Sequence, residues 1–273
     1  MKFNTQIQLA IFSISLLAFA SLSEAKDNSD TLPKDIENQI IDKVVQAYGG
    51  NTLQLAKSIS ISEHNKNFSP GQGESPKQPG VFNISEELTI DFEAKRKSVL
   101  SWRVSRTSKD LEKIIFDGEK GTVYDILNNK YADDDWFNYA STGAGIVRRS
   151  DTMIARKLAE KSTVTDYQGD VHYLGALHHK LDAKIGENTK YSLLINKMSG
   201  LITKMSRTHP SVGEISYTFS NHTKSDGVTY SQDLLFTVGG QVRAVSINRA
   251  IEINASISEA FTVPANYANW GDL

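Results

Sequence analysis

Hydrophobic residues follow a helical period near the start of the chain. Apolar side chains recur at a spacing that places them on one side of a helix, at Ile36, Ile40, Ile41, Val44 and Val45. Pro33 suits the first turn of such a helix, and Gly49-Gly50 suits its end. The pattern predicts one amphipathic helix that ends before Gly49.

From residue 57 the apolar residues alternate with polar ones, which is typical of half-buried strands. Turn residues separate the runs, as at Asp117-Gly118 and Asn128-Asn129. The alternation predicts roughly eleven antiparallel strands. Residues 128–150 break the pattern, and a second helix is expected over 151–161 with Ser150 or Asp151 as its N-cap.

Two helices are too few to cover both faces of so many strands. The fold class predicted is mainly β (α+β), with an antiparallel sheet that either closes on itself as a barrel or stays partly open. An open, curved, apolar concavity is by default a ligand site. No repeat and no linker divides the chain, so residues 34–273 are expected to form one domain. Its irregular parts would be a Gly/Pro loop at 69–80 and an insertion at 128–161.

The N-terminal segment has the pattern of a secretory signal peptide. A basic start at Lys2 precedes an apolar run, which ends at Ser23-Glu24-Ala25 with small residues at both cleavage-site positions. The run is shorter than the ~18–20 residues that span a bilayer. We therefore expect residues 1–25 to be removed and residues 26–33 to be flexible. The mature protein would be periplasmic or secreted, with no transmembrane anchor.

Composition excludes several classes of protein. The chain has no cysteine, so disulfide scaffolds and thiolate-ligated metal centres are ruled out. The formal net charge is −2, which gives no field for holding a nucleic acid. We expect no nucleic-acid partner.

Sequence motifs for catalysis or metal binding are missing or weak. His178-His179 are neighbours on a strand, so they point to opposite faces and cannot bind one ion; His178 is expected to face solvent and His179 to face inward. The run Asp133-Asp134-Asp135 lacks calcium-loop spacing and reads as a solvated loop. Arg148-Arg149 could meet an anionic head group or be ordinary surface charge. We expect no catalytic residue, no metal and no cofactor, and a protein that is not an enzyme.

Aromatic residues supply the candidate ligand site. Those of the alternating strands could line a concavity, and Trp136-Phe137 could be a loop anchor or a lip at its mouth. The residues expected to line the cavity, each of which could instead be ordinary core, are Trp102, Phe116, Tyr124, Trp136, Phe137, His179, Tyr191, Tyr217, Phe219 and Phe236.

The two ends of the predicted domain resemble a known family. The helix IIDKVVQAYGG runs into NTLQLAKSISIS, the middle contains FDGEKGTVYDI, and the chain closes with INASISEAFTVPANY. These segments are similar to the LolA/LolB-like superfamily, which includes periplasmic lipoprotein carriers. The resemblance implies a curved antiparallel half-barrel, with helices packed on it and acyl chains held in its concave face. The AYGG and GQGESP segments also resemble the N-terminal accessory region of some exported metallo-β-lactamase-fold proteins.

Three functions follow as expectations. The first is an exported protein that binds or carries a lipid-like ligand, either a hydrophobic small molecule or an acyl chain. The second is a non-catalytic module that docks on an envelope protein, either an envelope hydrolase or another envelope assembly, through a sheet face or the 69–80 loop. The third is a hydrolase whose site has no recognised motif.

Overall fold

The computed structural model describes residues 31–71, 78–106, 108–139, 149–185, 189–263 and 268–269. The predicted signal peptide at 1–25 and residues 72–77 of the 69–80 loop lie outside the described residues, as do residues 140–148 of the insertion. No helix in the described ranges has the length and apolar character needed to cross a membrane.

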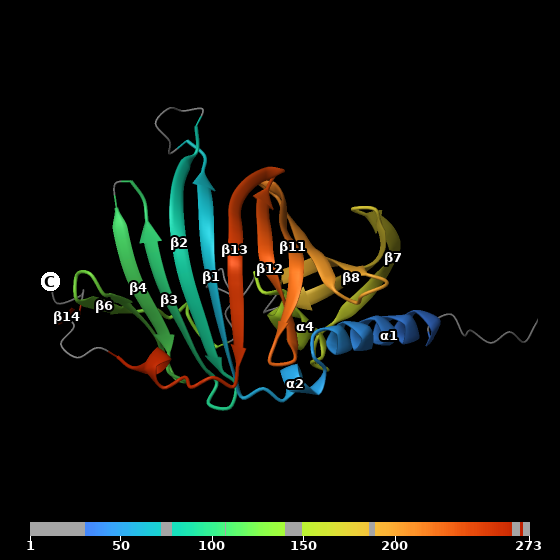
Figure 1. Cartoon of the computed structure of the whole chain (residues 1–273), viewed down its shortest axis with the longest axis horizontal. Helices are drawn as coiled ribbons and strands as arrows, with labels where there is room; N and C mark the ends of the chain where they lie inside the picture. The colour runs from blue at the N-terminus through green and yellow to red at the C-terminus, as the bar shows by residue number, and fades with distance from the viewer. Residues whose placement is uncertain are drawn as a thin grey trace, which may run out of the picture.

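One curved sheet of fourteen strands forms most of the protein (Figure 1). The strand order is β14-β6-β5-β4-β3-β2-β1-β13-β12-β11-β10-β9-β8-β7, and every neighbouring pair is antiparallel except β14 and β6. The strands are β1 Ser58–Ser69, β2 Gly80–Asp91, β3 Arg96–Val104, β4 Lys109–Phe116, β5 Gly121–Asp125, β6 Lys130–Asp133, β7 Thr165–Tyr173, β8 Ala176–Ile185, β9 Thr189–Asn196, β10 Ile202–His209, β11 Gly213–Ser225, β12 Val228–Val238, β13 Gln241–Ile253 and β14 Ala268–Asn269.

Short helices pack on one face of the sheet. They are α1 (Thr31–Ala47), α2 (Asn51–Gln54) and α4 (Asp151–Leu158), whereas a 3₁₀ turn, η1 (Glu259–Phe261), lies against the opposite face, where Lys113 Nζ donates to the Glu259 carbonyl at 3.1 Å. Of the two expected N-caps of α4, Ser150 is the one observed, and its hydroxyl accepts a hydrogen bond from the Met153 amide. α1 and α4 contact each other and lie chiefly against β7, β8 and β12.

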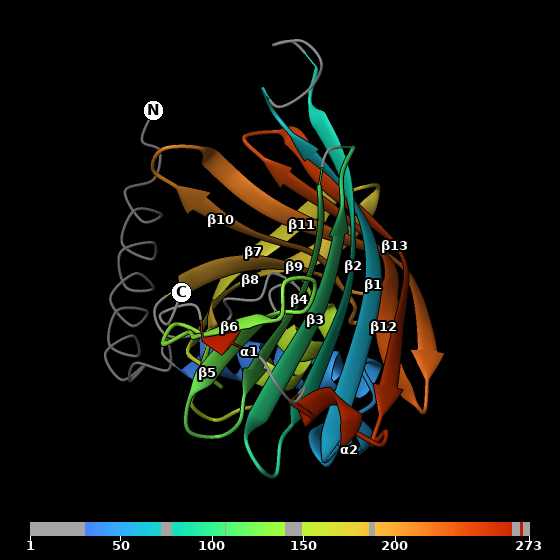
Figure 2. The same cartoon turned by 90° about the vertical axis from the view of Figure 1, so that its left-hand side faces the viewer.

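At one end of the sheet, antiparallel pairing places the hairpins β1–β2, β3–β4, β10–β11 and β12–β13, and the hairpins β5–β6 and β8–β9 turn toward the same end. In Figure 1 this end points upward for the central strands, whereas α1 and α2 lie at the opposite end. Figure 2 shows the curvature, with β7 to β10 turned to face β2 to β5 across the interior.

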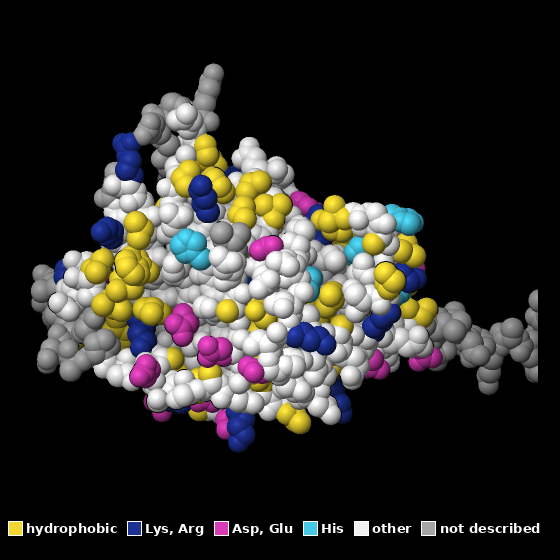
Figure 3. Space-filling model, viewed as in Figure 1, with side chains coloured by type: hydrophobic (Ala, Val, Ile, Leu, Met, Phe, Trp, Pro, Cys, Tyr) yellow, Lys and Arg dark blue, Asp and Glu magenta, His cyan; other side chains and the backbone are white. Residues whose placement is uncertain are grey.

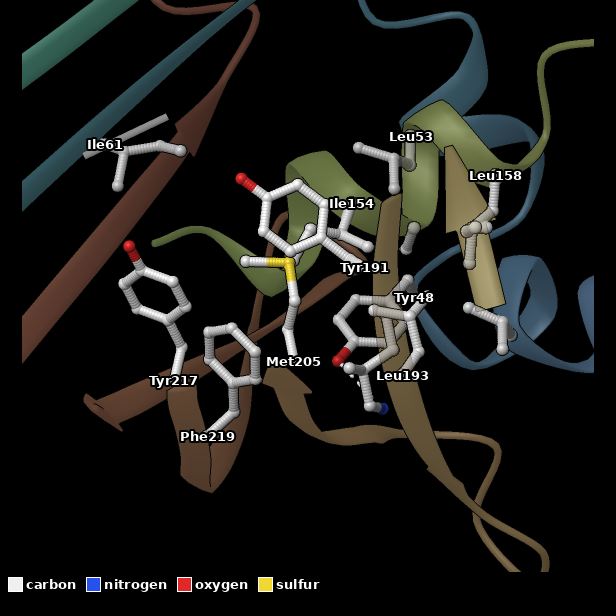
Figure 4. Close-up of a cluster of buried hydrophobic side chains, with 14 of the residues drawn as sticks. Tyr48, Leu53, Ile61, Ile154, Leu158, Tyr191, Leu193, Met205, Tyr217 and Phe219 are labelled. Carbon is white, nitrogen blue, oxygen red and sulfur yellow. Dashed lines mark hydrogen bonds between the residues drawn. The ribbon is translucent and has the colours of Figure 1, made fainter. Parts of the chain in front are cut away.

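The hydrophobic core joins the helices to the concave face. Tyr48 follows α1, Leu53 lies on α2 and Ile154 lies on α4, and all three are almost completely buried. Figure 4 shows Met205 and Phe219 of the sheet beneath Ile154, with Tyr48 beside Leu193. Burying side chains of this size contributes about 1.5–3 kcal/mol each. The helices therefore act as a plug at one end of a bent sheet.

The structure confirms the predicted fold class and its open form. The sheet does not close into a barrel, and it has fourteen strands instead of about eleven. Two of the additional strands are short, the edge strand β14 and its neighbour β6, and they carry little alternating signal. The segment after Gly50 contains the short helix α2, in addition to the two helices expected from the sequence.

The inner face of β13 departs from simple alternation along the strand. Sequence alternation groups Val245, Ile247, Ile251 and Ile253 on the same side of a strand. The pairing of β13 with β1 shifts between Ser62 and His64, and Asn248 has a φ of +58°. This irregularity turns Val245 to the outside while Ile251 stays in the core. It also brings Ser246 and Arg249 to the same inner face, although their numbers differ in parity.

Candidate functional site: the concave face

The concave face is the side of the sheet on which α1 and α4 pack. Near the helices, strands β1 to β5 present two cross-strand rows to it. The lower row is Ile59, Ile90, Lys97, Phe116 and Gly121, and the next is Ile61, Leu88, Val99, Ile114 and Val123. Members on β1, β2 and β3 are buried, whereas Phe116, Ile114 and Val123 are partly exposed. The β4–β5 part of this apolar surface is therefore still accessible to solvent among the described residues.

The next row on the concave face, beyond the row of Ile61 and Leu88, consists of polar residues. It reads Glu63, Glu86, Ser101, Glu112 and Asp125 across the same five strands. Glu63 and Glu86 stand directly opposite each other, an arrangement that repels unless a cation lies between them. Alternation along one strand cannot show that these residues form a row, because the register of five strands brings them side by side.

Arg149, just before α4, supplies the missing cation. Its guanidinium contacts Glu63 Oε1 at 2.7 Å and also pairs with Glu86. Asn65 Nδ2 donates to both carboxylates, at 2.8 Å and 3.1 Å. Burial alone would raise the pKa of Glu63, but Arg149 and Arg249 outweigh it and hold that pKa below its usual value. Burial and the nearby Glu63 raise the pKa of Glu86.

Arg249 extends the network to α4. Its Nε lies 3.2 Å from Glu63 Oε2, and its Nη1 donates to Ser231 Oγ at 2.8 Å and lies 3.7 Å from Asp151 Oδ1. Asp151, fully buried, also accepts from Ser231 Oγ at 2.8 Å and contacts His222 Nε2 at 3.2 Å. Although burial opposes it, His222 and Arg249 keep the pKa of Asp151 low.

Tyr48 joins this network to the end of α1. Its hydroxyl donates to Asp151 Oδ2 at 2.9 Å and accepts from the Ile202 amide at 3.2 Å. Burial, followed by the charge of Asp151, raises the pKa of Tyr48 well above its ordinary value. A continuous buried chain of polar contacts thus runs from β2 to β10. It fixes α4 on the sheet, since removing one member would leave its partners buried without compensation.

Sequence reasoning missed this network. The sequence offers Arg149 as a contact for an anionic head group or as ordinary surface charge, and its motifs do not point to Arg249, Asp151, Glu63 or His222 as site residues. A single signal was available: isolated charged residues inside otherwise alternating strands, as at Glu63 and Arg249.

Seven of the ten predicted lining residues lie on or face the concave side. Tyr191, Tyr217 and Phe219 are buried in the core, and Tyr217 stacks on Phe236 with ring centroids 4.9 Å apart. Phe137 is also buried, with Lys97 Nζ 4.7 Å from its ring centroid, which makes it a loop anchor. The other two concave residues are Phe116 and His179.

The remaining three lie elsewhere. The register of β2, β3, β4 and β5 places Trp102 and Tyr124 on the convex face, opposite Ile61 and Leu88. Trp102 is 54% exposed and Tyr124 is 8% exposed. Trp136 follows β6 and is 88% exposed. Parity along one strand cannot distinguish the concave face from the convex face, since only pairing with other strands defines which is which.

His178 and His179 point to opposite faces of β8, as alternation predicts. His179 Nδ1 lies 2.8 Å from Asp170 Oδ1, and this aspartate also accepts from Tyr167 and pairs with Lys197. These contacts outweigh burial and lower the pKa of Asp170 to about 2. The predicted exposure of His178 is wrong: it is 2% exposed, and its ring packs edge-on against Tyr173.

Metal ligation finds no support in the described ranges, where no group of three or more His, Cys, Asp or Glu side chains could hold an ion. Lys97 is a buried cation within the lower apolar row, and its Nζ lies 3.5 Å from the Tyr139 carbonyl. Burial lowers the pKa of Lys97 to about 8.

Comparison with known proteins identifies the fold. No family model matches the chain, and no curated protein matches its sequence. Among solved structures, it is similar to a putative outer membrane lipoprotein-sorting protein domain from Vibrio parahaemolyticus, with a TM-score of 0.52 and 10% identity over 82% of this chain and 95% of that chain. It is equally similar to a LolA superfamily protein from Nitrosomonas europaea, with a TM-score of 0.52 and 10% identity over 83% of this chain and 97% of that chain. The bent open sheet and its helical plug are therefore a LolA-like fold.

Proposed function

We propose that this protein is exported to the periplasm and binds or carries a lipid-like ligand on its concave face. One observation carries the proposal. The apolar rows of the concave face continue onto β4 and β5, whereas the helices lie chiefly against β7, β8 and β12. Ile114, Phe116 and Val123 are consequently partly exposed and could be covered by an apolar ligand.

The energetics suit a carrier that must release its load. Burying a dozen methylenes provides about 10 kcal/mol at ~0.8 kcal/mol each. Association costs at least ~4 kcal/mol, which leaves a dissociation constant in the micromolar to millimolar range. The likeness to a lipoprotein-sorting domain and the predicted signal peptide support this role and the periplasmic location.

A probe-binding experiment tests the proposal. A fluorescent fatty acid should bind the wild-type protein with micromolar to millimolar affinity. Ile114→Trp fills the concave surface and should weaken binding at least about tenfold, as expected when burial of about two methylenes is lost. Leu111→Trp lies three residues away on the convex face of the same strand and should leave binding unchanged.

Melting temperatures of both variants must stay close to that of the wild type for the comparison to hold. Absence of probe binding, together with absence of lipid in the native mass spectrum of freshly purified protein, would overturn the proposal. Equal loss of binding in the two variants would show that the probe does not occupy the concave face.

A further inference from the structure

The end of the sheet that carries the hairpins β1–β2, β3–β4, β10–β11 and β12–β13 differs in charge from the rest of the molecule. We define this hairpin rim as residues 66–71, 78–83, 102–106, 108–110, 207–214 and 238–243, all of which the structure describes. Its cations are Lys66, Arg103, Arg106, Lys109, Arg207 and Arg243, and its carboxylates are Asp110 and Glu214. Glu214 is already paired with Lys204 at 2.8 Å. The rim is therefore basic, although the whole chain has a formal net charge of −2.

The opposite end of the sheet provides an internal comparison. Its hairpin turns at 92–96, 117–120 and 224–227 carry the two signs in equal number. The cations are Lys95, Arg96, Lys120 and Lys224, and the anions are Glu93, Asp117, Glu119 and Asp226. The β9–β10 turn at 197–201 adds Lys197, which is already paired with Asp170. The excess of positive charge is thus a property of one end only.

Exposed apolar side chains lie among the cations of the rim. Trp102 is 54% exposed, Val81 46%, and Val212 and Val242 44% each. Figure 3 views the convex face and shows hydrophobic and basic side chains toward the hairpin end, with most of the visible acidic side chains in the lower half. Cations mixed with an aromatic ring and aliphatic groups are the composition of surfaces that enter the lipid headgroup region.

The cations are distributed over both faces of the sheet. Register places Lys66 and Lys109 on the convex side and Arg103 and Arg207 on the concave side. Arg103 also lies over the Phe82 ring, with its Cζ 5.6 Å from the centroid. Neither face of the sheet alone carries all six cations. They can therefore act together only at the end of the sheet.

We propose that the hairpin rim docks on the surface of an anionic phospholipid bilayer. The cations supply the long-range attraction to acidic headgroups, at about 1 kcal/mol for each Lys or Arg near the surface, and the exposed apolar residues enter the interface. A nucleic acid would use the cations but gain nothing from the three valines. This inference goes beyond ligand binding on the concave face and can be tested without any ligand.

Vesicle partitioning tests the electrostatic part. The wild type should bind vesicles of equal parts phosphatidylglycerol and phosphatidylcholine, bind pure phosphatidylcholine weakly, and lose the difference as salt rises. The triple variant K66E/K109E/R243E should partition at least about a hundredfold less, because three attractive charges are lost. The control K57E/K120E/K224E changes net charge equally at the opposite end, and should partition only slightly less than the wild type. All three proteins carry the same N-terminal segment, so its contribution cancels.

Tryptophan quenching tests the apolar part. Brominated phospholipid should quench the fluorescence of the wild type and of Trp136→Phe, which removes the exposed tryptophan beyond β6, away from the rim. Trp102→Phe should abolish most of that quenching. Equal binding by the two triple variants, equal quenching in both single variants, or no preference of the wild type for anionic vesicles would each overturn the proposal. Tight binding to DNA with no vesicle binding would assign the rim to a nucleic acid instead.

Discussion

Individual buried charges define the interior of this protein. Glu63, Asp151 and Arg249 are each at most 4% exposed, yet every one contacts an oppositely charged group. A buried pair adds little net stability because desolvation offsets the attraction, but losing one partner is costly. The network therefore fixes where α4 sits more than it stabilises the fold.

Arg249→Met should lower the free energy of unfolding by about 3–5 kcal/mol, since Glu63 and Asp151 would stay buried without their shared partner. Denaturant titration measures the change. Arg243→Met, six residues earlier on the same strand, is the matched control and should change stability by no more than about 0.5 kcal/mol. A small effect of both substitutions would show that the network contributes no structural constraint.

Lys97 makes stability depend on pH in a defined window. Its pKa falls to about 8 in the folded protein, so the folded state loses its proton before the unfolded state does. Unfolding then takes up a proton between pH 8 and the usual lysine value. The contribution of Lys97 to the free energy of unfolding must accordingly rise with pH in that window, by at most about 1.4 kcal/mol per pH unit.

Unfolding free energies of wild type and Lys97→Met, compared from pH 7 to pH 10, check this expectation. The difference between them should be largest at pH 7, where the variant is the more stable protein, and should shrink above pH 8. Lys109 is exposed, so the difference in free energy of unfolding between Lys109→Met and the wild type should stay constant over the same pH range. A pH-independent difference for Lys97→Met would contradict the buried-cation interpretation.

Among the elements, the edge strand β7 has a specific protection. Glu37 on α1 accepts hydrogen bonds from the Tyr167 amide at 2.8 Å and from Thr165 Oγ1 at 3.2 Å. An edge strand with free amides is a template for pairing with another chain. Glu37 of α1 thus provides hydrogen-bond acceptors for donors of β7, an edge strand that has no neighbouring strand on its outer side among the described residues.

Glu37→Ala should expose this part of β7. We expect faster hydrogen–deuterium exchange across residues 165–173 and a loss of about 1 kcal/mol in the free energy of unfolding, the usual value of one hydrogen bond. Glu37→Gln keeps an acceptor oxygen and should restore much of the protection, whereas Asp42→Ala on the exposed side of α1 should change neither quantity. Unchanged exchange in Glu37→Ala would show that the edge is protected by other means.

At the scale of the whole molecule, the proposed ligand links function to stability. A ligand that binds only the folded protein raises the free energy of unfolding by about 2.7 kcal/mol at a hundred times its dissociation constant. For a chain of this size, that corresponds to a rise of about 5–10 °C in melting temperature. A fatty acid at such a concentration should produce this rise in the wild type and a much smaller one in Ile114→Trp. No rise in the wild type would argue against binding to the folded state.

Local patterns in the sequence determined the elements of this protein. The period of apolar residues gave α1, α4 and most strands, because side-chain direction repeats every 3.6 residues in a helix and every two in a strand. The scarcity of helix, together with the quoted family segments, indicated an open and curved sheet. The sequence of one strand does not reveal which of its faces is concave. For this reason Trp102 and Tyr124, which lie on the convex face, were predicted to line the cavity together with Tyr217.

Tertiary structure decided everything that depends on register. The opposition of Glu63 and Glu86, the irregularity that turns Arg249 inward, and the place of Arg149 between the two carboxylates all arise from pairing between distant segments. The same pairing gathers the basic residues of four hairpins at one end of the sheet. Such contacts form between residues far apart in the chain, and local periodicity contains no information about them.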